Sequence, residues 1–390
     1  MLECWRWYGP LDYISLEQVA QTGATGIVTA LHEIPYGEVW PLEAIVERKS
    51  LIEKDPTLGL SWQVVESLPV HEHIKRGHGD LEPLFDNYRQ SMRNLAKAGI
   101  RTICYNFMPL LDWTRTDLAK PLPRGGHALH FSAPRMAAFE LFMLGRKQAE
   151  DDYQPSTIKE ARIWFEGSTG QDRDELLASI MSGLPGAYDR YDCQTLAQAL
   201  AQYDGIDRNA LRENYKRILE AIMPLAEELD MRFCVHPDDP PRDILGLPRI
   251  VSNAQDIEWI LDAVPSPSNG LTLCSGSHGA NPGNDVPAIA KQFADKVFFA
   301  HLRNVKKYDD GSFTEAAHLG GDTDMVALVR HLLNEQTRRG QEKAADLIPF
   351  RPDHGHALLD DLNRKAHPGY PLIGRMCGLA EMRGLIAALN

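Results

Sequence analysis

The sequence predicts an α/β protein of the (β/α)8, or TIM, barrel class, with a helical insertion after the fourth strand. Eight short segments rich in β-branched and apolar residues alternate with eight helical segments along the 390 residues. Strands that alternate with helices of this length form βαβ units and a parallel sheet, and eight such units close a barrel. No glycine-rich dinucleotide fingerprint follows an early strand, which disfavours the rival doubly wound open sheet.

The predicted strands are short apolar segments, and most of them are followed by Gly, Pro, Asn or Asp. This pattern is typical of a buried strand at the point where it leaves a sheet. The eight segments are Leu2–Tyr8, Thr25–Leu31, Leu60–Glu66, Arg101–Phe107, Met231–His236, Leu271–Cys274, Val297–His301 and Leu347–Arg351.

The predicted helices lie between these strands. In the first helix, Ser15 stands at the start and Gln18 follows three residues later, which is the arrangement of a capping box. The eight helical segments are Ser15–Gln21, Leu42–Lys54, Leu81–Ala98, Asn209–Asp230, Ala254–Ala263, Val286–Ala294, Asp324–Glu335 and Met382–Leu389.

The chain is longer than the roughly 250 residues of a typical barrel, and the excess lies between the fourth strand and the helix at Asn209. Residues 108–208 contain several prolines and glycines, an apolar helical run at Met136–Leu144 and an acidic stretch at Glu150–Asp152. We predict that residues 1–390 form one barrel domain, within which residues 108–208 are a helical cap or oligomerisation arm.

Composition and charge exclude several classes of protein. Lys plus Arg total 41 and Asp plus Glu total 54, so the formal net charge of −13 argues against nucleic acid or an anionic membrane as a partner. No apolar stretch approaches the roughly 20 residues of a membrane span, and the N-terminus lacks the apolar segment of a secretory signal. The six cysteines show no CxxC spacing, which favours reduced thiols and a cytoplasmic location.

The last four predicted strands end on residues that bind metals, namely His236, Cys274, His301 and Asp353. Barrel enzymes carry their chemistry at the C-terminal ends of the strands, so these four side chains are expected to converge. One such residue alone is more often a core or rim residue, but the coincidence on four successive strands favours a metal site. The mixed donor set leaves the metal open, because thiolate and imidazole suit Fe²⁺ or Zn²⁺ and carboxylate suits Mn²⁺.

Five further residues near the strand ends are candidates for contact with a substrate. His354 is a candidate acid or base, or else a partner that orients a metal ligand. Arg303 is a candidate for bidentate binding of a substrate carboxylate, and the alternative is that it forms a surface ion pair. Tyr370 either transfers a proton or packs, and His32 and His318 lie on predicted loops at the barrel mouth.

Spacing alone indicates a metal-dependent barrel enzyme without naming its reaction. A sugar isomerase or epimerase would use the cation to polarise a carbonyl and would move a proton without losing water. A non-catalytic sugar-acid binder is a further alternative, in which four protein ligands close a tetrahedral zinc site.

Seven longer motifs extend from the first strand to the last helix: WRWYGP, TALHEIPYGEVW, FCVHPDDPP, LTLCSGSHGANPGND, FAHLRNV, FRPDHGH and GYPLIGR. Together they resemble the D-mannonate dehydratases of the metal-dependent, xylose-isomerase-like barrel type. This resemblance implies a (β/α)8 barrel with a helical insertion. It also implies a hydro-lyase that uses Mn²⁺ or Fe²⁺ to convert D-mannonate to 2-keto-3-deoxy-D-gluconate in glucuronate catabolism.

Carried over motif by motif, the resemblance implies the metal ligands His236, Cys274, His301 and Asp353 and the catalytic pair His354 and Tyr370. Dehydration requires one group to remove the C2 proton and another to protonate the departing C3 hydroxyl. We favour His354 as the acid and Tyr370 as the base, with Arg303 binding the substrate carboxylate and His32 and His318 as further substrate contacts. A homo-oligomer, most simply a dimer, is expected.

Overall fold

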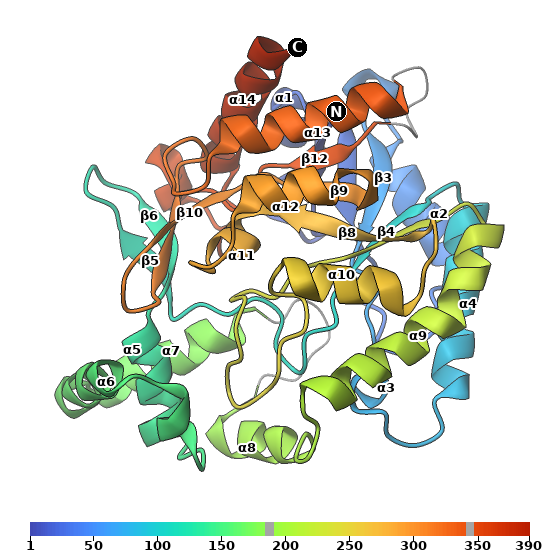
Figure 1. Ribbon diagram of the computed structural model, residues 1–390. Coiled ribbons are helices and arrows are strands. Elements are labelled where there is room, and N and C mark those ends of the chain that lie inside the picture. The colour runs from blue at the N-terminus through green and yellow to red at the C-terminus, as the bar shows by residue number, and fades with distance from the viewer. Residues whose placement is uncertain (184–190, 341–346) are drawn as a thin grey trace.

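The computed structural model describes residues 1–183, 191–340 and 347–390. Eight parallel strands close a barrel in the order β1-β12-β9-β8-β7-β4-β3-β2 (Figure 1). Their bounds are Leu2–Arg6 (β1), Gly26–Thr29 (β2), Ser61–Glu66 (β3), Thr102–Tyr105 (β4), Arg232–Val235 (β7), Asn269–Cys274 (β8), Val297–His301 (β9) and Pro349–Arg351 (β12). Each of the eight predicted strands is therefore confirmed, and so is the barrel class.

The barrel strands are apolar on both faces, because one face lines the barrel interior and the other packs beneath the helices. The interior is filled by a buried cluster that comprises Cys4, Val28, Val64, Cys104, Cys234, Phe298 and Phe299. The main core under the helices includes Ile27, Ile103 and Phe233. Close packing on both faces holds the strands in place, and with them the residues at their C-terminal ends.

Helices follow the strands around the barrel. They are Leu16–Gln21 (α1), Leu42–Ile52 (α2), Glu72–Arg76 (α3), Glu82–Lys97 (α4), Arg208–Glu228 (α9), Ala254–Ala263 (α10), Ser275–Gly279 (α11), Val286–Gln292 (α12), Met325–Arg339 (α13) and Leu372–Leu389 (α14). The capping box predicted at the start of α1 is confirmed, because Ser15 and Gln18 exchange side-chain and backbone hydrogen bonds.

The last helix is longer than predicted, since α14 begins at Leu372 and the prediction began it at Met382. Glycine has a low helix propensity, and because Gly374 and Gly378 lie in the first half of α14, the sequence pattern did not predict a helix there. Both are buried, and a Cβ at Gly378 would lie 2.1 Å from the ring of His318. Tertiary packing thus requires glycine at a position where local propensity disfavours it.

Residues 108–208, predicted as a helical insertion, also contain two strands. The structure places β5 (Asp117–Pro121) and β6 (His127–Phe131) beside β10 (Asn304–Lys307) and β11 (Phe313–Ala316), in an antiparallel sheet of order β10-β11-β6-β5. The partner β11 is far along the chain, so a local pattern could not reveal this pairing. Residues 184–190 of the predicted insertion lie outside the described residues.

Helices follow this hairpin in the segment between β4 and β7. They are Ala133–Ala138 (α5), Pro155–Gly167 (α6), Gly170–Met181 (α7) and Cys193–Ala201 (α8), with one π-helical turn at Phe139–Met143. Figure 1 shows α5, α6 and α7 grouped at the opposite side of the molecule from α13 and α14. Within the described residues, the helices include none that is both long and apolar enough to cross a membrane.

Candidate metal centre

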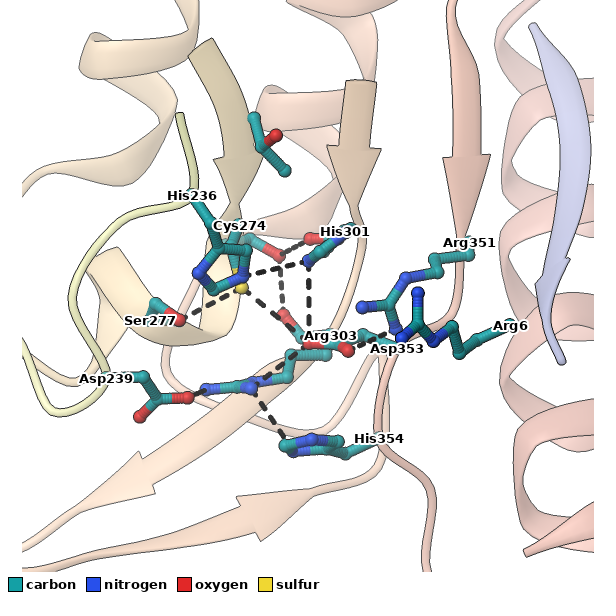
Figure 2. A network of polar contacts seen from close by, with 12 residues as sticks. Arg6, His236, Asp239, Cys274, Ser277, His301, Arg303, Arg351, Asp353 and His354 are labelled. Atoms are coloured by element: carbon teal, nitrogen blue, oxygen red, sulfur yellow. Dashed lines mark hydrogen bonds and ion pairs between the residues drawn. The ribbon is translucent and has the colours of Figure 1, made fainter. Parts of the chain in front are cut away.

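Three side chains of types that can bind a metal meet at the C-terminal ends of neighbouring barrel strands (Figure 2). His236 follows β7, Cys274 ends β8 and His301 ends β9, and one ligand atom of each lies within 4.8 Å of the others. All three residues are buried. The register of β8 against β9 pairs Cys274 directly with His301, so the parallel sheet itself brings the thiol and the imidazole together.

A hydrogen bond orients the imidazole of His236, and the ring of His301 lies beside it. His236 Nδ1 lies 2.7 Å from the carbonyl oxygen of Pro237, which only accepts, so Nδ1 donates this hydrogen bond and Nε2 is the nitrogen on the side of the other donors. Nε2 then faces His301 Nδ1 at 3.1 Å. His301 Nε2 points toward Glu66 Oε1 at 3.5 Å.

Such an arrangement leaves two ring nitrogens aimed at the same point beside a cysteine sulfur. A cation shared by His236, Cys274 and His301 would satisfy both nitrogens and the thiolate at once. The donor set therefore fits a transition metal or zinc.

Asp353 lies beside these three donors. Its Oδ2 is 3.7 Å from Cys274 Sγ and 3.9 Å from His301 Nδ1. Its backbone adopts a φ of 63°, a left-handed conformation that is uncommon outside glycine and is often found at functional sites. Although burial opposes ionisation, Arg351 holds the pKa of Asp353 well below its usual range, so the carboxylate is charged.

Charged residues that sequence analysis did not single out surround the site. Glu66 ends β3 and Arg351 ends β12, and Asp239 follows β7. Burial alone would raise the pKa of Glu66, but Arg351 overrides burial and lowers it to about 2. Glu66 and Arg351 both stand at the C-terminal ends of strands. The rule that identified the predicted ligands from strand ends could therefore have identified these two residues as well.

A pocket opens above the donors and is lined by five of the predicted residues: His236, Arg303, Asp353, His354 and Tyr370. Residues that were not predicted complete the lining, and they are Arg6, Tyr8, Glu66, Ser67, Asn106, Asp112, Trp113, Asp239 and Arg351. Asp112 and Trp113 come from the segment after β4, so residues 108–208 contribute part of the wall.

His354 and Tyr370 stand next to each other in this pocket. Their rings meet edge to face with centroids 5.0 Å apart. Tyr370 Oη lies 3.5 Å from Asp353 Oδ1, and burial raises the pKa of Tyr370 well above its usual value. Both side chains therefore line the same pocket as His236.

Arg303 lines the pocket but is already engaged with protein carboxylates. Its Nη2 donates to Asp239 Oδ2 at 2.6 Å, and its Nη1 lies 3.1 Å from Asp353 Oδ2. Figure 2 shows the guanidinium between these groups and His354. Any substrate carboxylate at Arg303 would share the guanidinium with these two acids.

The structure does not bring His32 and His318 to the lining of this pocket. His32 lies behind Arg6, which lines the pocket, and its Nε2 is 3.2 Å from Arg6 Nη2. His318 Nε2 donates to the carbonyl oxygen of Pro352 at 2.7 Å and thereby supports the residue that precedes Asp353.

Comparisons with known proteins agree with the architecture of this site. A sequence profile of the D-mannonate dehydratase (UxuA) family matches residues 1–390. The mannonate dehydratase of Chromohalobacter salexigens is 53% identical over 391 residues, which cover 100% of this chain and 99% of that protein. The mannonate dehydratase of a Marinomonas species is likewise 53% identical, with the same coverage.

A solved structure extends the similarity to three dimensions. The mannonate dehydratase of Streptococcus suis serotype 2 matches with a TM-score of 0.77 at 34% identity, covering 100% of this chain and 93% of that chain. The similarity thus extends over the whole of this chain. The chain belongs to the D-mannonate dehydratase family.

Proposed function

We propose that this protein is a hydro-lyase that converts D-mannonate to 2-keto-3-deoxy-D-gluconate, a step of glucuronate catabolism. The observation that carries the proposal is the full-length family match together with the buried His236, Cys274 and His301 cluster at the barrel mouth. The reaction removes the C2 proton and the C3 hydroxyl as water, and the resulting enol tautomerises to the 2-keto acid.

We propose that His236, Cys274, His301 and Asp353 hold the metal, and that it is Mn²⁺ or Fe²⁺. The donor set supports this proposal, because imidazole and thiolate bind Fe²⁺ well and the added carboxylate also suits Mn²⁺. A bound divalent cation supplies Lewis-acid stabilisation of the negative charge that develops next to the carboxylate.

His354 and Tyr370 divide the two proton transfers in this proposal. The proposal is supported by their positions, because both line the pocket and their rings are adjacent. One removes the C2 proton and the other protonates the leaving hydroxyl. Arg303 is the proposed contact for the substrate carboxylate, with His32 and His318 as supporting residues behind the pocket wall.

The buried walls of the pocket support a further part of the mechanism. Asp353, Arg303 and His354 are each at most 3% exposed, so the reacting atoms would lie among fixed charges with little bulk water. In such an environment, charge that develops on the substrate interacts more strongly with the protein than it would in solution.

We also propose a cytoplasmic location and a homo-oligomer, most simply a dimer. All six cysteines are free, as expected in a reducing compartment. Light scattering coupled to size-exclusion chromatography would measure the oligomeric state.

The proposed activity is tested by incubating metal-stripped protein with D-mannonate, with and without Mn²⁺ or Fe²⁺, and following the 2-keto-3-deoxy acid over time. We expect product only with added metal, and none with the His236→Ala variant. His73→Ala, at an exposed histidine, serves as the matched control. Absence of keto-deoxy acid with either metal, in protein that binds metal, would reject the dehydratase and redirect the search to isomerase and epimerase substrates.

A further inference from the structure

A carboxylate outside the barrel strands contacts the ring of His354. Glu315 lies on β11 of the four-stranded antiparallel sheet, and its Oε1 is 3.1 Å from His354 Nδ1. β11 pairs with β10 on one side and with β6 on the other, so the backbone that carries Glu315 is held on both edges. The carboxylate is 3% exposed and reaches the barrel mouth from a different sheet.

A second group competes for the same nitrogen of His354. Arg303 Nη1 lies 3.2 Å from Nδ1, in nearly the same range as Glu315 Oε1. A guanidinium only donates hydrogen bonds and an ionised carboxylate only accepts them. Nδ1 therefore cannot satisfy both neighbours. It either carries a proton and donates to Glu315, or it lacks a proton and accepts from Arg303.

Charge decides this competition in favour of Glu315. Arg303 already donates through Nη1 to Asp353 and through Nη2 to Asp239. A bare Nδ1 lone pair would face the anionic oxygen of Glu315 at 3.1 Å, which is repulsive. Arg303, despite burial, lowers the pKa of Glu315 to about 2, so this oxygen is an acceptor at neutral pH.

A buried arginine fixes the carboxylate in turn. Arg115 Nη2 donates to Glu315 Oε1 at 2.8 Å, and Arg115 also donates through both terminal nitrogens to Asp239, at 2.8 and 3.0 Å. The Arg115 side chain is fully buried. The position of Glu315 is therefore set by the Arg115 guanidinium, which itself forms a bidentate ion pair with Asp239 in the loop after β7.

From this geometry we propose that Glu315 is a positioning residue for His354: its carboxylate accepts the Nδ1–H hydrogen bond, which sets the tautomer and leaves Nε2 for the substrate. The inference rests on the role proposed above for His354. Nε2 is then the nitrogen that exchanges a proton with the substrate, whether His354 acts as the acid or as the base. Arg115 supports this arrangement indirectly, because it holds Glu315 in place.

Kinetics of Glu315→Ala test the proposal. We expect kcat for D-mannonate to fall between about 10- and 100-fold, as is usual when the group behind a working imidazole is removed. Bound metal should stay near the wild-type value, because Glu315 contacts none of the proposed metal ligands. The loss in kcat should exceed any change in KM, because Glu315 reaches the proposed substrate contact Arg303 only at 3.4 Å, between Oε2 and Nε. Glu315→Gln, which keeps the size and removes the charge, serves if the alanine variant does not fold.

Glu335→Ala is the matched control. Glu335 on α13 is also buried and accepts hydrogen bonds from two arginines, Arg338 and Arg339, but it does not line the pocket. We expect this variant to lose stability and to keep kcat. A wild-type kcat in Glu315→Ala, or a kcat loss that matches the loss of bound metal, would overturn the positioning role.

Nuclear magnetic resonance of ¹⁵N-histidine-labelled full-length protein loaded with diamagnetic Zn²⁺ gives a readout that needs no activity. The His354 signals are assigned by comparison with His354→Gln. We expect a proton on Nδ1 in the wild type. In Glu315→Ala the carboxylate is gone and Arg303, which only donates, still faces Nδ1, so the proton should move to Nε2. A proton that remains on Nδ1 in the variant refutes the inference. A tautomer shift without any dehydratase activity in the wild type would instead reject the proposed function and retain the placement of His354.

Discussion

Glu66 and Arg351 form a two-point ion pair across the mouth of the barrel, with Arg351 Nε 3.0 Å from Oε2 and Nη2 2.7 Å from Oε1. Glu66 ends β3 and Arg351 ends β12, and two strands, β1 and β2, separate them in the barrel. Arg351 also contacts Asp353, so one guanidinium neutralises the buried Asp353 and the partly buried Glu66 beside the candidate metal centre.

Replacement of Arg351 is therefore expected to be costly. Arg351→Met leaves Glu66 and Asp353 without their main counter-charge, and breaking a buried ion pair typically costs about 3–5 kcal/mol. Arg383→Met is the control, because the Arg383–Glu3 pair is largely at the surface, with side chains 43% and 22% exposed, and such pairs contribute about 1 kcal/mol or less. Urea unfolding of both variants at pH 7 measures the difference, and equal losses would contradict the importance of the buried pair.

Removal of a single donor should abolish stable metal binding. Cys274 Sγ lies with His236 and His301 in a set of donors within 4.8 Å, so Cys274→Ala removes one of three converging ligands. We expect metal affinity to fall by at least about 100-fold, beyond the usual effect of residues behind the ligands. The measurement is metal content after dialysis against a weak chelator. Cys377→Ala, at an exposed thiol on α14, should retain its metal, and loss of metal from both variants would point to general destabilisation.

The stability contribution of Asp239 should depend on pH. Burial alone would raise the pKa of Asp239, but Arg115 and Arg303 hold it well below its usual range. A carboxyl with a lowered pKa in the folded state stabilises the fold above its unfolded pKa of about 3.9, and this stabilisation is lost as the pH falls toward the folded value. Asp239→Asn should thus cost about 3–5 kcal/mol at pH 7.

The difference between Asp239→Asn and the wild type should then shrink at acidic pH. Thermal or urea unfolding of both proteins from pH 7 down to about pH 2.5, more than one pH unit below the unfolded pKa of about 3.9, measures this change. A difference that stays constant over the whole range would show that the charge of Asp239 contributes no stability.

The role proposed for Arg303 predicts a change in KM. Arg303→Lys keeps the positive charge near Asp239 and Asp353 but removes the planar fork that binds a carboxylate through two points. We expect KM for D-mannonate to rise about tenfold or more, equivalent to about 1.4 kcal/mol or more of lost binding. Steady-state kinetics across a range of D-mannonate concentrations measure it, and an unchanged KM would discard Arg303 as the carboxylate contact.

Local patterns accounted for the barrel and for the residues at its strand ends. Strands and helices each follow from a periodicity that only a few neighbouring residues create, and parallel βαβ units constrain where the C-terminal ends of the strands meet. For this reason the sequence alone predicts that His236, Cys274 and His301 lie together. The missed half of α14 shows the limit, because its glycines are required by packing against residues far away in the sequence.

Tertiary structure alone decided how the side chains at the mouth are paired. Glu315 and Arg115 lie 200 positions apart and meet only because β11 packs beside the β5–β6 hairpin. The sequence left Arg303 as a carboxylate contact or a surface ion pair, whereas in the structure it is buried and shared between Asp239 and Asp353. The sequence by itself determined the fold class and the chemical types at the strand ends, because both depend on short-range periodicity. The pairing of buried charges depends on which chain segments meet in space, and that was determined only by the folded chain.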